Sequence, residues 1–153
     1  MAESGNTWFL EQRALWLAAL FFNRQPGVRV TEWKQDESLD LVIALDKEEN
    51  ALPQFLGVVS IGVTHEEELP TSYNIPRSSA GFYDATRFPI LLLVFTMQKA
   101  DQGYFRWLQE PTLLGIESRK SGEWTLLTDA TLAPIIAQVS AWYNKTPEGS
   151  AEG

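Results

Sequence analysis

The segment FPILLLVFTM, residues 88–97, limits most strongly what this chain can fold into. It carries no charged side chain and is almost continuously apolar. A strand of this kind needs cover on both faces, because a strand with one face in water alternates apolar and polar residues. The segment therefore predicts the central strand of a sheet that has other layers packed against both of its sides.

Other apolar segments complete a mixed sheet around this strand. Three segments before it are joined by short polar turns, and they predict an antiparallel meander because the connections are too short for a crossover. After it, a hairpin strand is expected at 104–109, and TLLGIES and EWTLLTD are expected to pair with each other. The meander segments are VRVTEW (28–33), LDLVIAL (39–45) and QFLGVVSIGVT (54–64).

Three helices are expected to flank the sheet. The first covers about 7–23, with Asn6 or Thr7 as N-cap. It is apolar almost all round from Ala14 on, which is typical of a helix sandwiched between layers. A short helix is expected within 78–87 and a last one over about 130–144. This order predicts an α/β or α+β three-layer domain, with a central mixed sheet flanked by helices.

Length and composition indicate one domain with one sizeable core. The chain has 153 residues, is 44% hydrophobic and contains six tryptophans, so it is expected to fold unaided. No internal repeat or linker divides it. We expect a single domain over 1–145, followed by a disordered tail, TPEGSAEG, over 146–153.

The chain contains no cysteine, which excludes disulfides, thiolate nucleophiles and cysteine-ligated zinc. This composition fits a cytoplasmic location. The start, MAESGNTWFLEQ, lacks the positively charged region of a secretory signal. The longest apolar stretch, Ala14 to Phe22, is well short of the ~20 residues that span a bilayer. We therefore expect a cytoplasmic protein without membrane association.

The chain is acidic, with 20 acidic residues against 12 basic ones and a net charge of −8. Its basic residues are scattered rather than gathered in a run. Strong binding to duplex nucleic acid needs cationic contacts to phosphates, and an acidic field opposes them. The acidity therefore indicates solubility, a basic protein partner or mimicry of the charge of a nucleic acid, and it argues against strong duplex binding.

Most familiar catalytic arrangements are missing from the sequence. His65 is the only histidine, so a structural zinc site is not expected. The sequence contains no Gly-x-Ser-x-Gly elbow, no phosphate-binding Gly-x-x-x-x-Gly-Lys loop and no Gly-x-Gly-x-x-Gly turn.

Two acidic residues occupy positions where carboxylates are uncommon. Glu11 lies in the first helix with apolar residues on its own side, where a buried carboxylate needs a partner or a metal ion. Alternatively, it lies in exposed first turns and favours the positive end of the helix. Asp40 lies between two leucines at the start of an apolar strand. It either points outward or forms a turn with Ser38.

The order of these pieces resembles the restriction-endonuclease-like PD-(D/E)xK superfamily, and more narrowly a bacterial domain-of-unknown-function family within it. In that family an N-terminal helix carries an early glutamate, an aspartate opens a strand, and the next strand ends in Gln-Val-Lys. A Pro-Val-Ile-Leu-Val-like strand then leads into a hairpin with Tyr-Trp. The resemblance covers about residues 7–110. The matching segments are EQRALWLAALF from Glu11, DESLDLVIAL around Asp40, FLGVVSIGVT at 55–64 and FPILLLVFTMQKADQGYFRW at 88–107.

The resemblance implies metal-assisted phosphodiester hydrolysis, in which carboxylates hold Mg²⁺ and a lysine stabilises the attacking water and the developing charge. It implies that Glu11 and Asp40 are retained metal ligands. The Gln-x-Lys step falls on Val59-Ser60-Ile61, so both working positions, Val59 and Ile61, are aliphatic. No Asp, Glu, Gln or Lys lies from 55 to 64, so a shift of the match does not restore the motif. We therefore expect a degenerate member of the family with no cofactor.

Three functions stay open. The first is a catalytically inactive nuclease-like domain that acts in binding, with a protein partner favoured over nucleic acid. The second is a live Mg²⁺-dependent DNA nuclease with a rearranged site, in which Glu11 and Asp40 hold the metal and His65, Glu66 or Arg77 supplies the rest. The third is an acidic immunity or inhibitor-type domain that engages a basic target. A homodimer is expected only by analogy, because nuclease-like domains often pair.

Overall fold

The computed structural model describes residues 2–35, 38–45, 54–65, 69–70, 80–85, 88–97, 102–119 and 121–152. The helices and strands follow one another in an order close to the one that the sequence predicts. The elements are α1 (Ala2–Asn23), β1 (Val28–Glu32), β2 (Leu41–Leu45), β3 (Gln54–Val63), α2 (Ala80–Ala85), β4 (Ile90–Thr96), β5 (Gln102–Thr112), β6 (Gly115–Ser118), β7 (Thr125–Leu126) and α3 (Asp129–Glu152).

The strands form one seven-stranded mixed sheet in the order β1-β2-β3-β4-β5-β6, with β7 also paired to β5. The predicted antiparallel meander of β1, β2 and β3 is confirmed. β4 pairs parallel with β3, and the chain between them, which includes α2, makes the crossover that a parallel pair needs. Every residue of β4 is buried, which confirms the predicted central strand.

Each face of the sheet carries its own apolar cluster. On one face, buried residues of α1 and α3 pack against one set of alternating strand residues. On the other face, residues of α2 and of the segments around it pack against the other set. In β4, for example, Leu91, Leu93 and Phe95 face α1 and α3, whereas Leu92 and Val94 face α2. The predicted three-layer domain with a central mixed sheet is therefore confirmed.

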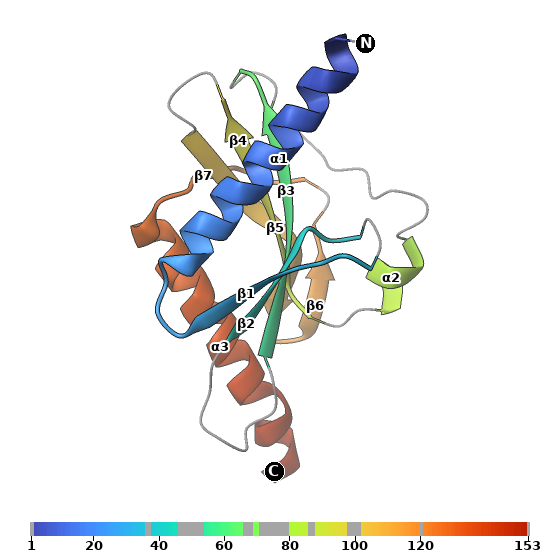
Figure 1. Cartoon of the computed structure of the whole chain (residues 1–153). Helices are drawn as coiled ribbons and strands as arrows, with labels where there is room; N and C mark the ends of the chain where they lie inside the picture. Colours follow the sequence, from blue (N-terminus) through green and yellow to red (C-terminus); the bar gives the residue numbers. More distant parts are fainter. Residues whose placement is uncertain are drawn as a thin grey trace.

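Figure 1 shows α1 crossing the sheet obliquely, with its C-terminal end close to the start of α3, while α2 lies apart from both. The two long helices are joined where they meet. Gln25 Nε2 donates a hydrogen bond to the backbone carbonyl of Asp129 (3.2 Å), and Arg24 forms an ion pair with the Asp129 carboxylate (3.4 Å). Arg24 also lies over the ring of Phe21.

α1 is longer and less covered than the sequence predicts. It begins at Ala2 rather than near Thr7, although the added segment AESGN includes Ser4, Gly5 and Asn6, which are weak helix formers. On its outer side, Phe9, Trp16 and Leu20 keep 65%, 64% and 49% of their surface exposed. The helix therefore packs on one side only, and the prediction of a sandwiched helix is wrong.

The predicted pairing of the last two short strands is also wrong. β6 and β7 both pair with β5, at Gln109–Thr112 and at Tyr104–Phe105. β5 is eleven residues long, so it offers room for two partners along its length. Because each short strand finds a partner on β5, no separate hairpin of the two forms.

α3 extends to Glu152, so most of the segment 146–153 is helical rather than the predicted disordered tail. Extending a helix that is already anchored adds about one hydrogen bond per residue, except at Pro147, which has no N–H, whereas starting a helix is costly. Tyr143 provides part of the anchor: its hydroxyl donates to the carbonyl of Phe55 (2.7 Å) and accepts from the Phe55 amide (3.2 Å). Burial raises the pKa of Tyr143 to about 12. Within the described residues, no helix is both long enough and apolar enough to cross a bilayer.

Candidate functional site

Asp40 lies at the bend where the chain enters β2, beside the middle of β3. Its amide donates to the carbonyl of Val58 (2.8 Å), and its carboxylate accepts a hydrogen bond from the amide of Ser60 (2.8 Å). The paired part of β2 begins at Leu41, whereas β3 continues to Val63. The Asp40 carboxylate therefore replaces a strand partner for the Ser60 amide, which β2 does not reach.

Burial raises the pKa of the Asp40 carboxyl above its usual value of about 3.9. The hydrogen bond from the Ser60 amide opposes this rise because it favours the charged form. The negative charge of Glu11 adds to the rise, and Glu32 contributes less. Glu11 of α1 and Glu32 at the end of β1 therefore each lie within electrostatic range of Asp40.

Glu11 itself is exposed. The sequence allowed two interpretations of Glu11: a buried carboxylate that needs a partner, or an acid in exposed first turns of the helix. The structure supports the exposed acid. Its neighbour Leu10 faces β3, so Glu11 lies at the rim of the contact between α1 and the sheet. The structure therefore brings Glu11 toward Asp40 but leaves Glu11 in contact with water.

Side chains along β3 point alternately to the two faces of the sheet. The sequence alone does not show which of them face α1 and which face α2. Val59 and Ile61 pack in the cluster on the α2 face. Val58 packs in the cluster on the α1 face, and Ser60 and Gly62 follow it on the same face because side chains alternate along a strand. The two aliphatic positions that the resemblance aligns with a Gln-x-Lys step thus lie on the face away from α1 and Glu11.

At Gly62 the backbone of α1 comes very close to the sheet. A Cβ atom built on Gly62 would lie 2.4 Å from the carbonyl oxygen of Leu10 and 3.0 Å from Met97 Cε. The 2.4 Å contact is to helix backbone, which cannot turn away as a flexible side chain can. No side chain fits at position 62 unless α1 moves.

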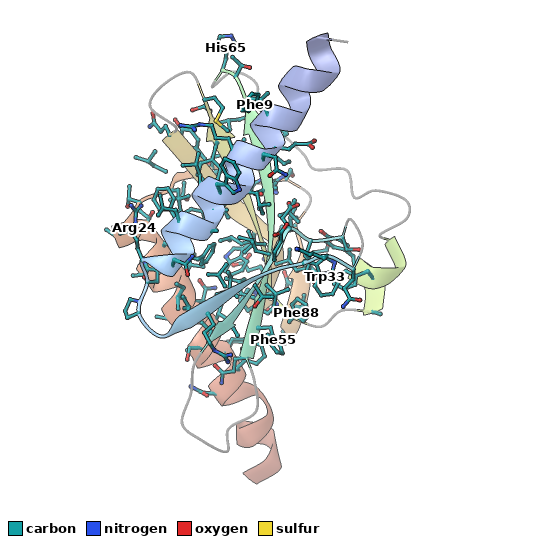
Figure 2. All side chains as sticks on the ribbon, in the orientation of Figure 1. Phe9, Arg24, Trp33, Phe55, His65 and Phe88 are labelled. Atoms are coloured by element: carbon teal, nitrogen blue, oxygen red, sulfur yellow. The ribbon has the colours of Figure 1, made fainter. Side chains whose placement is uncertain are left out.

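The residues that would complete a metal site do not gather around Asp40 in the described part of the chain. There, no group of three histidine or acidic side chains is arranged to hold a metal ion. His65 is exposed just beyond the end of β3. Figure 2 shows His65 toward the end of α1 that carries Phe9, at the opposite end of β3 from Phe55. Glu66 and Arg77, the other expected contributors, lie outside the described residues.

Sequence reasoning identified Asp40 and Glu11 but missed Glu32, Ser60 and Gly62. Gly62 carried a usable signal, because a glycine inside an apolar strand often marks a close approach of another backbone. Ser60 is the one polar residue in the middle of β3, but it bonds to Asp40 through its backbone amide, so its side chain gave no signal of the contact. Glu32 carried no signal of its own, because it looks like any acid on an exposed strand.

A separate cavity of about 580 Å³ lies between β5 and the start of α3. Arg106 lines it together with Arg119 and Glu110. The buried Arg106 guanidinium lies 5.1 Å from the centre of the Trp124 ring and donates to the carbonyls of Trp107 (3.3 Å) and Arg119 (3.2 Å). Burial lowers the pKa of Arg106. These contacts tie β5 to the segment before β7, so Arg106 serves the fold.

The Asp40 carboxylate thus caps the backbone amide of Ser60 beneath the first half of α1, with the acids Glu11 and Glu32 within electrostatic range. Comparison with known proteins adds no family to this description. The chain has no significant match to a protein-family model, to a curated protein or to a solved structure.

Proposed function

We propose that this domain is a nuclease-like scaffold without catalytic activity that acts by binding another protein. Its ancestry would be the PD-(D/E)xK superfamily that the sequence resembles. Asp40 and Glu11 would be remnants of the metal site. Asp40 now has a structural role, because its carboxylate caps the Ser60 amide.

The contact between Gly62 and the Leu10 carbonyl carries the proposal. A nuclease lysine has to share a face with the carboxylates, since both act on the same phosphate. On the α1 face of β3, the last acid and the lysine two residues later would occupy Ser60 and Gly62. Position 62 has no room for a side chain. The site is therefore filled by α1 as well as deprived of its lysine.

The proximity of Glu11 and Asp40 supports the ancestry. The charge of Glu11 raises the pKa of Asp40, so the two carboxylates lie near each other although they come from α1 and from the start of β2. The order of α1, three antiparallel strands, α2 and a parallel β4 also follows the order that the resemblance predicts.

The surface favours a protein as the partner. Leu113 and Leu114 form the turn between β5 and β6 and are 90% and 93% exposed. Tight hairpin turns usually use glycine or asparagine, so leucines there do not serve the turn itself. Exposed apolar residues on an acidic chain suit contact with protein, whereas phosphate contacts require basic residues.

Cleavage assays test the proposal. The protein is incubated with supercoiled plasmid and with single-stranded DNA in Mg²⁺ and in Mn²⁺, beside Asp40→Asn and Glu11→Gln. Asparagine keeps an oxygen acceptor for the Ser60 amide, so a loss of activity in Asp40→Asn would not simply reflect unfolding. We expect no cleavage above the two variants. Cleavage by the wild type that both substitutions abolish would overturn the proposal.

An acidic immunity or inhibitor-type domain is the second candidate. The net charge of −8 favours it, because a basic target protein would be attracted over long range. It differs from the first candidate in requiring no nuclease ancestry. Mn²⁺ binding bears on the ancestry: weak binding at millimolar Mn²⁺ that is lost in Asp40→Asn would support a remnant metal site and would count against the second candidate.

A further inference from the structure

The outer side of α1 carries a narrow row of exposed residues, which we call the outer row: Phe9, Arg13, Trp16 and Leu20. They are spaced four, three and four residues apart. At 100° per residue they fall within about 60° of the helix circumference. All four are exposed, and the three apolar members keep between 49% and 65% of their surface in contact with water.

The outer row lies opposite the side of α1 that packs on the sheet. The buried residues Ala14, Ala18 and Phe22 point the other way. A helix that is apolar all round is normally buried all round. In α1 only one side is buried within the chain, so the outer row is the kind of surface that a partner covers.

We propose that the outer row binds the outer row of a second copy of this chain, with the two α1 helices antiparallel. The spacing of four, three and four residues is the spacing of a heptad seam, in which two helices interlock side by side. An exposed seam of this kind fits another helix better than it fits a strand or a loop.

The outer row is complementary to itself in this antiparallel arrangement. A two-fold axis between Ala14 and Leu15 places Phe9 against Leu20 of the second copy. The same axis places Arg13 against Trp16 of the second copy. Each pair occurs twice, as the symmetry of a two-fold interface requires. The apolar residues therefore meet each other, and each guanidinium lies over an indole ring, where a cation is attracted.

The arrangement also explains why the outer row contains a charge. Arg13 is the only charged member, and no acid lies in the row. A fully apolar seam would attract many helices, whereas a single polar residue in a seam fixes register and orientation at some cost in stability. Here the arginine favours the antiparallel register, because only that register places both arginines against tryptophans.

The interface is small, so we expect a weak dimer. The three apolar side chains leave roughly 350 Å² exposed per protomer, given that a whole aromatic side chain buries about 150–250 Å². A standard stable interface buries about 800 Å² per partner. We therefore expect a dissociation constant in the micromolar range or above. A groove of about 270 Å³ beside the row, between α1 and β1, leaves space for side chains of the second copy.

Sedimentation velocity from about 1 µM to about 1 mM protein tests the association. We expect a concentration-dependent dimer that Trp16→Glu weakens by about tenfold or more. Ala137→Glu is the matched control, because Ala137 is exposed on the outer side of α3, and it should leave the dimer unchanged. A wild-type protein that stays monomeric at about 1 mM would overturn the proposal. An equal weakening of the dimer by Trp16→Glu and by Ala137→Glu would also overturn it.

Cross-linking tests the register. The chain has no cysteine, so single substitutions report without background. A mixture of Phe9→Cys and Leu20→Cys should form a disulfide-linked heterodimer on oxidation, and each variant alone should not. Rapid cross-linking of Phe9→Cys with itself would show parallel helices and overturn the arrangement. These outcomes are independent of the proposed function, because neither measurement depends on nuclease ancestry.

Discussion

The two long helices cover the same face of the sheet, but they differ on the side that faces away from it. α3 directs Leu132 and Val139 into the core, and its exposed positions in the described part hold small or polar residues such as Ala133 and Ala137. α1 directs Ala14, Ala18 and Phe22 inward but also holds large apolar residues outward. α3 is therefore complete within one chain, whereas α1 has a second apolar side that one chain leaves open.

The two helices also differ in how they meet the sheet. α1 lies so close that its backbone touches the backbone of β3 at Gly62, and small residues, Ala14 and Ala18, face the sheet beside it. α3 packs through larger side chains, and Tyr143 bonds to the backbone of Phe55 at the start of β3. The close approach of α1 leaves no room for a side chain at position 62.

The largest effect is expected from truncating the inner side of α1. Phe22 is fully buried, so Phe22→Ala should lower the free energy of unfolding by about 3–5 kcal/mol, through lost burial and the cavity left behind. Phe9→Ala is the same substitution on the outer side. In dilute protein it should cost less than about 1 kcal/mol, because the monomer leaves Phe9 largely in water. Chemical denaturation at submicromolar concentration measures both.

If Phe22→Ala and Phe9→Ala lowered the free energy of unfolding equally, Phe9 would belong to the core of the monomer. That result would contradict the assignment of a buried inner side and an exposed outer side to α1. Leu132→Ala extends the comparison to α3. It should cost about 2–5 kcal/mol, since Leu132 is also fully buried. The inner sides of the two helices are therefore expected to behave alike.

A smaller effect is expected where α1 touches β3. Gly62→Ala places a methyl group against the Leu10 carbonyl, so the helix or the strand must shift. We expect a loss of roughly 1–3 kcal/mol in the free energy of unfolding, as for other overpacked sites. Gly81 in α2 is the control, because a Cβ there meets nothing within 4 Å. Gly81→Ala should be neutral or stabilise by up to about 1 kcal/mol. If Gly62→Ala left the free energy of unfolding unchanged, α1 could move away from the sheet. Position 62 could then hold a side chain.

The smallest effect on the free energy of unfolding is expected from Asp40, which lies beneath α1. Because burial raises the pKa of Asp40, the folded protein holds that proton to higher pH than the unfolded chain does. The contribution of Asp40 to stability is therefore greatest below about pH 4 and falls as pH rises through the raised pKa. Stability of the wild type relative to Asp40→Asn should decline over that window and then level off. A difference that grows with pH would mean that the charged form is the one that the fold stabilises.

Much of the fold could be predicted from the sequence, for a physical reason that differs between elements. The central strand β4 was identified because it has no polar face, and the meander was identified because its connecting turns are short. The start of α1 was placed too late, since its cap position depends on which residues pack and not on local preference alone. The partners of β6 and β7 could not be chosen, because either strand can pair with the other or with β5.

The candidate site could be predicted in its residues but not in its geometry. Asp40 and Glu11 were identifiable as acids among apolar neighbours. Which residues of β3 would face them was not, because β3 is buried on both faces for much of its length and its pattern does not distinguish one face from the other. A difference of one residue separates Val59 and Ile61, on the α2 face, from Ser60 and Gly62, on the α1 face.

The sequence by itself determined the three-layer arrangement, the buried centre of the sheet and the acidity of the surface. These depend on how many apolar residues occur and how they are spaced, and both are written in the chain. The tertiary structure decided which side of α1 meets the sheet, how closely it approaches Gly62 and what the Asp40 carboxylate bonds to. A helix with apolar residues on both sides carries no sequence signal for its orientation, so only packing against β3 selects the inner side and leaves the outer row exposed.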